Sequence, residues 1–239
     1  MFKAYASGSS GNFYECDDGT TRLGLDCGLT YKKLQKACKN TLGGIQAFLI
    51  THEHGDHAKG VRSLMERGVD IYTSRGTAEA LELDTEDPQV HIVEPLKQFE
   101  VGSYKIKGFK TIHDAAEPLG YLIKSTVTGE KLVWFTDTAA INHRFDKCAE
   151  IAVECNYSEM DLMADKQLPM RVLHRIRHSH MSVEDLERYL MMWDLSETKL
   201  IHLIHLSTRH AYAEEFIKRI QTATGIETRA AGRNGYDGT

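Results

Sequence analysis

Short apolar segments alternate with polar or glycine-rich turns through the first half of the chain, a pattern typical of β-strands. The run 46–50 predicts a buried strand, and Val61, Leu64 and Met65 follow it at helical spacing. The other strands of this half are expected at 2–6, 12–16, 21–28, 69–73, 91–93, 104–112, 120–124 and 131–136, and the helices at 30–39, 58–67 and 77–83.

The second half repeats this rhythm, with strands at 150–155 and 200–204 and helices at 170–176, 182–193 and 211–223. Ser182 and Asp185 form the N-terminal signature of a capping box. Because strands are followed by mixed β/α units in both halves, we predict an α/β fold of two sheets packed face to face with helices outside. No linker or repeat divides the sequence, so one domain over 1–239 is expected.

Charge and cysteine content limit the binding partners and the cellular compartment that we expect for this protein. The 29 Lys and Arg against 34 Asp and Glu give a formal net charge of −5, which argues against a protein that coats long stretches of duplex. No stripe of basic and aromatic residues is visible along the sequence either. Five cysteines without C-x-x-C spacing, and no signal peptide or membrane span, predict a cytoplasmic protein with no membrane partner.

The sequence THEHGDH follows the buried strand at 46–50 directly. His52 and His54 project to one side of an extended segment, and Asp56 and His57 begin the next helix. Imidazole and carboxylate are ligands of a borderline cation such as Zn²⁺. A polar loop with chance histidines is the alternative, but this density of chelating side chains after a buried strand favours a metal site.

Three further candidates share one context, a chelating side chain at the end of an apolar strand: His113, Asp137 and His205. Asp137 is suited to bridge two cations. His202 competes with His205 but lies inside its strand, so His205 is preferred. Two cations, Zn²⁺ with Mn²⁺ as the alternative, would polarise a phosphoryl or carbonyl oxygen and lower the pKa of a bridging water, which predicts a hydrolase.

The segment HSHMS adds a proton donor. His180 and Ser182 lie where the chain enters a capped helix, whose N–H groups attract phosphate, and His180 can protonate a leaving alkoxide. Glu154 ends a strand and can orient that histidine. Basic residues nearby favour a phosphate-bearing substrate, although each one singly also fits a solvated helix face: Arg171, Arg175, Arg177 and His178.

These motifs together resemble the metallo-β-lactamase superfamily, and within it the YycJ/WalJ-type proteins and the similar phage anti-Pycsar phosphodiesterases. The quoted segments are SGSSGN (7–12), LDCGLT (25–30), THEHGDH (51–57), HDAAEP (113–118), FTDT (135–138), ECN (154–156), SHMS (179–182) and HLS (205–207). The resemblance implies an αββα sandwich with a dinuclear site, Asp26 supporting it from behind, and a homodimer. ECN and SHMS are also similar to two tRNase Z motifs, which implies proton transfer by Glu154 and His180.

The resemblance implies two activities. One is hydrolysis of cyclic mononucleotides such as cCMP and cUMP, which counteracts Pycsar immune signalling, in the host cytoplasm if the protein is phage-encoded. The other is 5′-to-3′ DNA exonuclease activity. The short chain after His205, the negative charge and the missing basic stripe favour the cyclic nucleotide. A thioesterase-type hydrolase is a more distant alternative, since it would not explain ECN and SHMS.

The expected site therefore has three groups of residues. The metal ligands are His52, His54, Asp56, His57, His113, Asp137 and His205. The catalytic residues are Asp56, Glu154 and His180. The substrate-binding residues are Ser9, Asn12, Ser182 and Ser207, with the SGSSGN loop lining the pocket. A plain turn is the alternative for that loop.

Overall fold

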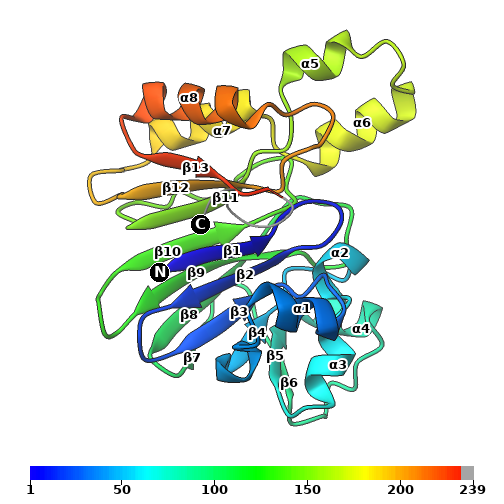
Figure 1. The fold of residues 1–239 in the computed structure, drawn as a ribbon, viewed down its shortest axis with the longest axis vertical. Helices are drawn as coiled ribbons and strands as arrows, with labels where there is room; N and C mark the ends of the chain where they lie inside the picture. Colours follow the sequence, from blue (N-terminus) through cyan, green and yellow to red (C-terminus); the bar gives the residue numbers. More distant parts are fainter. Residues whose placement is uncertain (233–239) are drawn as a thin grey trace.

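Six strands form the first sheet of the computed structural model, which describes residues 1–232 (Figure 1). Its order is β1-β2-β3-β4-β5-β6, antiparallel over the first three strands and parallel over the rest. The strands are β1 (Phe2–Ala6), β2 (Phe13–Asp17), β3 (Arg22–Leu25), β4 (Ala47–Leu49), β5 (Asp70–Thr73) and β6 (Val90–Ile92). Because the last four strands run parallel, their carboxyl ends share one edge of the sheet.

The second sheet has seven strands in the order β13-β12-β11-β10-β9-β8-β7. Strands β7 to β10 pair antiparallel, and β10 to β13 pair parallel. The strands are β7 (Gln98–Val101), β8 (Tyr104–Lys110), β9 (Leu119–Ser125), β10 (Lys131–Phe135), β11 (Glu150–Glu154), β12 (Leu200–Ile204) and β13 (Thr228–Ala230). In each sheet, the strands that come first in the sequence pair antiparallel and the later strands pair parallel. This explains why the two halves of the sequence show the same order of elements.

Helices cover the outer faces of the two sheets (Figure 1). The short helices beside the first sheet are α1 (Tyr31–Ala37), η1 (Leu42–Gly44), α2 (Gly55–Ala58), α3 (Val61–Met65) and α4 (Arg75–Ala80). Those of the second half are α5 (Glu159–Ala164), α6 (Met170–Ser179), α7 (Val183–Met192) and α8 (Ala213–Thr224). Helices α7 and α8 pack on the second sheet, whereas α5 and α6 project beyond it. In residues 1–232, no helix has the length and apolar character needed to cross a bilayer.

The main core lies between the sheets, where Tyr14, Tyr104, Tyr121 and Trp134 are fully buried. Separate apolar clusters join each sheet to its helices. The predicted αββα order of layers is confirmed. The single domain expected over 1–239 includes residues 233–239, which lie outside the described residues.

The expected helix at 58–67 is wrong as one element, because it divides into α2 and α3 around Gly60. The Gly60 N–H donates to the carbonyl of Cys27, 2.8 Å away, so it leaves the helical hydrogen-bond ladder. A Cβ at Gly60 would lie 2.9 Å from the carbonyl oxygen of Leu29, so only glycine fits this close approach. The sequence patterns also miss β7, β13 and α5, which are short and depend on their neighbours.

Asp18 joins the β2–β3 turn of the first sheet to the second sheet. Its Oδ2 accepts hydrogen bonds from Ser103 Oγ at 2.7 Å and Ser125 Oγ at 2.6 Å. Burial alone would raise the pKa of Asp18, but hydrogen bonds from Ser125, the backbone of Thr21 and Ser103 lower it to about 2.

Asp18→Asn is therefore expected to lower the free energy of unfolding at neutral pH by about 1 kcal/mol, after allowance for partial exposure. A carboxylate with a lowered pKa stabilises the fold above its ordinary pKa of 3.8, and this contribution is lost as pH falls toward 2. Urea unfolding of both proteins across this range measures the difference. A difference that persisted unchanged at acidic pH would contradict the charge-based explanation.

Candidate metal centre and its proton donor

The chain leaves β4 at the edge where the two sheets meet, and the THEHGDH segment turns there into α2. His52 and His57 are buried, whereas His54, the N-cap residue of α2, is half-buried. The side chain of Asp56 is 27% exposed, so the cluster reaches solvent on that side. A short segment thus supplies four chelating side chains around one point.

One group consists of three histidines. The Nδ1 atom of His54 lies 3.1 Å from Nε2 of His52 and 3.2 Å from Nε2 of His113. His113 follows β8 and comes from the other sheet, so this group joins both halves of the sandwich. These three residues can hold a metal ion, with ligand atoms within 4.8 Å of one another.

Asp56, His57 and His205 form a second group that can hold a metal ion. Asp56 Oδ2 lies 3.6 Å from His57 Nε2 and 3.7 Å from His205 Nε2. His205 Nε2 is buried and has no hydrogen-bond partner among the described residues. Because a buried nitrogen without a partner is costly, a bound cation is the fitting partner for this atom.

Asp137 lies between the two groups. Its Oδ1 is 3.4 Å from His57 Nε2 and 3.2 Å from His205 Nδ1, and its Oδ2 is 3.6 Å from His113 Nε2. The seven predicted ligands are therefore brought together, in the two groups that the sequence indicated, with Asp137 between them.

Asp26, Asp137 and His205 all have positive φ angles, of 54°, 41° and 53°, and all follow strands. Side chains other than glycine rarely adopt this conformation, which is costly and clusters at functional sites. The turn redirects each side chain as it leaves its sheet. Backbone strain at three site residues thus marks this edge of the sandwich.

Hydrogen bonds from behind fix which nitrogen of each ring faces the centre. His57 Nδ1 donates to Asp26 Oδ2 at 2.6 Å. Thr51 Oγ1 donates to the same carboxylate and accepts from His52 Nδ1 at 3.0 Å. His113 Nδ1 donates to the carbonyl of Ser179 at 2.8 Å. Each of these rings therefore turns an Nε2 lone pair toward the centre, as metal-binding histidines do.

The charges within the cluster also favour cation binding. Burial lowers the pKa of His52 well below its ordinary value, so its imidazole is neutral and can donate a lone pair. Burial would raise the pKa of Asp137, but His205, His57 and His52 hold it well below its ordinary value, so the carboxylate is ionised. Burial lowers the pKa of His57 and His205, but Asp137 and neighbouring carboxylates raise it overall, so these two rings release a proton when a cation binds. Neutral imidazoles and ionised carboxylates then form the donor set of a divalent metal site.

His180 and Glu154 form a separate pair beside Asp137. His180 Nδ1 donates to Glu154 Oε1 at 2.7 Å and lies 4.0 Å from Asp137 Oδ2. Glu154 is fully buried, while His180 keeps 11% of its side chain exposed. Burial lowers the pKa of His180, but the carboxylates of Glu154 and Asp137 raise it overall. This arrangement suits a proton donor beside the metal cluster.

The same Glu154 oxygen accepts from His205 Nδ1 at 3.0 Å, so one carboxylate serves the proton donor and a ligand. Asp137, Glu154, His180 and His205 also satisfy the spacing of a metal-binding group. His180 therefore has two readings, proton donor or ligand, which measurement of metal content separates.

The four expected substrate-binding residues occupy different environments. Ser9 and Ser207 line one cavity of about 200 Å³ beside the loop that follows β12. Asn12 is buried, with its Nδ2 3.0 Å from His57 Nε2. Ser182 is fully buried as the N-cap of α7, where it accepts from the Asp185 N–H at 3.1 Å, so it does not face a cavity.

Thr51 and Asn156 were given no role in the sequence analysis, although both lie in the quoted motifs. Thr51 connects Asp26 to His52, and Asn156 Nδ2 donates to the His205 carbonyl at 2.8 Å. In the sequence, only their position beside chelating residues indicates that they could support the site. His202, the competitor of His205, instead contacts Glu150, with Nε2 3.0 Å from Oε2.

Asp26→Asn is expected to weaken metal binding by about 10- to 100-fold, because Asp26 orients His57 directly and His52 through Thr51. Asparagine tolerates the positive φ at this position, so the fold is expected to persist. Competition with a chromophoric chelator measures the affinity, and circular dichroism checks the fold. Unchanged metal affinity would show that Asp26 has no part in orienting the ligands.

Comparison with known proteins shows several relatives. The family model described as "Beta-lactamase superfamily domain" matches residues 21–205, a range that contains all seven candidate ligands. Exodeoxyribonuclease WalJ of Streptococcus pneumoniae is 30% identical over 228 residues, which cover 89% of this chain and 84% of that protein. Exodeoxyribonuclease YycJ of Bacillus anthracis is 28% identical over 245 residues, covering 97% and 90%. The metallo-β-lactamase fold protein YhfI of Bacillus subtilis superposes with a TM-score of 0.72 at 18% identity, covering 98% of this chain and 97% of that one.

Proposed function

The chain belongs to the metallo-β-lactamase superfamily, in its YycJ/WalJ-like branch, and from this premise we propose that it is a metal-dependent phosphodiesterase that removes nucleotides from a DNA end. The observation that carries the proposal is the Glu154–His180 pair, with His180 Nδ1 4.0 Å from Asp137 at the metal cluster. Some substrates of metal-dependent hydrolases have leaving groups that depart without a proton. The sugar alkoxide released from a phosphodiester, in contrast, requires one.

Two divalent cations would occupy the cluster, one held by His52, His54 and His113 and the other by Asp56, His57 and His205, with Asp137 shared. Zn²⁺ fits the donor set, and Mn²⁺ is the alternative. Bound there, the cations would neutralise charge on a phosphoryl group and lower the pKa of a water molecule.

The side chains of this protein supply position and a proton. Glu154 holds the His180 ring through Nδ1, which leaves Nε2 to donate a proton to the departing sugar oxygen. Burial lowers the pKa of His180, but Glu154 and Asp137 raise it overall, which favours the protonated form that a donor needs. Asp56, which is partly exposed, lies where substrate phosphate would approach.

We propose DNA as the substrate in preference to the cyclic mononucleotide that the sequence features favoured. The curated relatives at 30% and 28% identity are both named exodeoxyribonucleases, and they support the alternative activity rather than immune-signal hydrolysis. The negative net charge was a weak guide to the substrate, because it is a sum over the whole chain and does not show where the basic side chains lie. Thioester hydrolysis lacks a use for the Glu154–His180 pair.

A homodimer, expected from the family resemblance, stays a proposal. Its test is the mass of the metal-loaded protein in solution by light scattering, where a mass near 27.0 kDa would indicate a monomer.

The deciding experiment compares substrates under one set of conditions. Metal-loaded protein is incubated with 5′-labelled DNA, cUMP, cCMP, cAMP and a thioester, with and without EDTA. Stepwise shortening of DNA from one end, lost in EDTA, is expected. Ring opening of a cyclic nucleotide with intact DNA would overturn the exonuclease proposal in favour of signal degradation. His178→Ala protein serves as the histidine control for His180→Ala, since His178 is exposed and, among the described residues, contacts only the carbonyl and ring of His174.

A further inference from the structure

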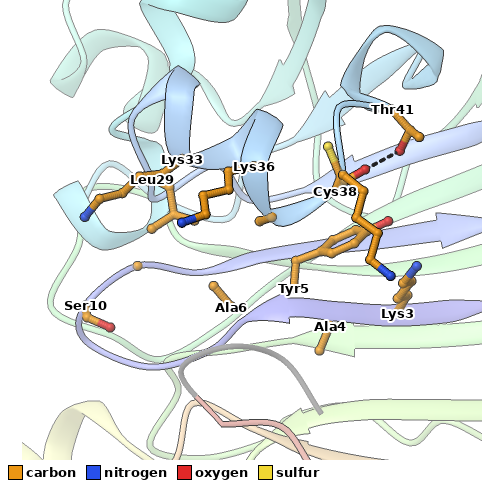
Figure 2. A pocket seen from close by; sticks show the side chains of 13 residues that line it. Lys3, Ala4, Tyr5, Ala6, Ser10, Leu29, Lys33, Lys36, Cys38 and Thr41 are labelled. Atoms are coloured by element: carbon orange, nitrogen blue, oxygen red, sulfur yellow. Dashed lines mark hydrogen bonds between the residues drawn. The ribbon is translucent and has the colours of Figure 1, made fainter. Parts of the chain in front are cut away.

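A second cavity lies between β1 and α1, outside the metal cluster (Figure 2). Its volume is about 730 Å³, and none of the candidate ligands lines it. Lys3 and Tyr5 rise from β1, and Lys33 and Lys36 extend from α1 on the opposite side. Lys39 completes the basic lining. We call this cavity the lysine groove.

The lysine groove is positive although the chain has a net charge of −5. Within the described residues, four lysines line it and no acidic residue does. All four are exposed, and among residues 1–232 none forms an ion pair. Unpaired cations on facing walls repel one another unless an anion lies between them, so this charge distribution favours a polyanionic ligand.

Two of the lysines lie close together on one helix. Lys33 and Lys36 are one helical turn apart, or about 4.5 Å, on the same face of α1. This spacing is comparable with the roughly 3.4 Å axial separation of phosphates along one DNA strand. The half-buried Tyr5 ring lies among them, with Lys3 Nζ 4.8 Å from its centroid. A basic groove with an aromatic side chain is the composition of single-strand binding sites.

The groove ends at the loop that supports the metal cluster. Ser10 and Gly11 form its wall at that end. The next residue, Asn12, donates its backbone N–H to the carbonyl of Asp56 at 2.7 Å, and its side chain contacts His57. A strand that leaves the cluster past this loop would therefore enter the lysine groove.

We propose that the lysine groove binds the phosphate backbone of a single DNA strand whose end occupies the metal cluster. This inference rests on the proposed nuclease function and gives it a substrate class, a strand several nucleotides long. The groove is not visible as a stripe along the sequence. Lys3 and Tyr5 are separated from Lys33, Lys36 and Lys39 along the sequence, and only the fold brings them together.

The test compares two triple variants of equal charge change. Lys33→Ala/Lys36→Ala/Lys39→Ala removes the helix-side cations, and Lys107→Ala/Lys124→Ala/Lys218→Ala removes exposed, unpaired lysines elsewhere. Metal-loaded proteins are titrated with a fluorescent phosphorothioate strand of about 12 nucleotides, between about 50 and 200 mM salt. Turnover of bis(p-nitrophenyl) phosphate reports on the metal cluster.

The groove variant is expected to bind the strand at least about 10-fold more weakly, with a salt slope smaller by about 2, because each lost phosphate contact contributes about 0.7. Its turnover of the small ester stays within about twofold, and the control variant keeps wild-type affinity. Equal losses in both variants, or no loss in the groove variant, would overturn the proposal. Equal competition by polyglutamate would also overturn it, in favour of a general polyanion site.

A double variant, Lys33→Gln/Lys36→Gln, keeps helix-forming side chains and guards against a folding defect. Its slope is expected to fall by about 1.4. Failure of the proposed function appears separately, as a wild-type protein that shortens no DNA. If that protein still bound the strand through the lysines, the groove would stand and the nuclease assignment would fall.

Discussion

Asp137→Asn is expected to abolish phosphodiesterase turnover, with a loss of about 10³-fold or more, and to reduce the metal content per chain. The carboxylate lies between both ligand groups, within 3.6 Å of His57, His113 and His205. Losing one shared anionic ligand removes several kcal/mol of stabilisation of developing charge. Atomic emission measures the metal, and bis(p-nitrophenyl) phosphate measures the rate.

Asp137→Asn removes the negative charge while the fold is expected to persist. Asparagine is nearly the same size as aspartate and tolerates the φ of 41° at this position. The matched control is Asp84→Asn, since Asp84 is exposed and its side chain, among the described residues, accepts only from the Glu86 N–H. Full metal content together with a full rate in Asp137→Asn would refute the metal centre described above.

His180→Ala is expected to retain the metal and to lose about 10²- to 10⁴-fold in the rate on DNA. The loss should shrink below about tenfold for a p-nitrophenyl ester, because p-nitrophenolate leaves without a proton. His178→Ala, on the exposed side of α6, should be unaffected for both substrates. Loss of metal in His180→Ala would instead make His180 a ligand, a reading its place beside Asp137 also allows.

The pH profile gives a second readout for His180. Burial lowers its pKa, but Glu154 and Asp137 raise it overall. The donor contributes below that pKa, and its contribution is lost as pH rises through it. We expect the wild-type rate on DNA to fall on this basic limb, and His180→Ala to lack the limb. An unchanged profile would contradict proton donation.

The sequence was a good guide wherever one local signal decided the outcome. The polar side chains at strand ends, His113, Asp137 and His205, are in the cluster because β8, β10 and β12 run in the same direction and end at one edge of the sheet. Ser182 begins α7 as its capping pattern predicts. The same cap also buries its side chain, which no local sequence signal indicated.

Other features depended on contacts between distant parts of the chain. The proton on His57 is set by Asp26, 31 positions away, and that on His113 by the Ser179 carbonyl, 66 positions away. The short strands β7 and β13 exist because neighbouring strands pair with them. No local pattern carries this information, since the partner that completes each hydrogen bond is remote in sequence.

By itself, the sequence determined the family, the layers of the fold and which candidate ligands would lie together, because these follow from residue motifs, periodicity and side-chain chemistry at strand ends. The tertiary structure decided which nitrogen of His52, His57 and His113 faces the centre, and where the positive charge lies. Net charge is a sum over the chain, whereas an electrostatic field depends on position. Only the folded chain places Lys3 opposite Lys33 and Lys36, and so gives an acidic protein a basic groove.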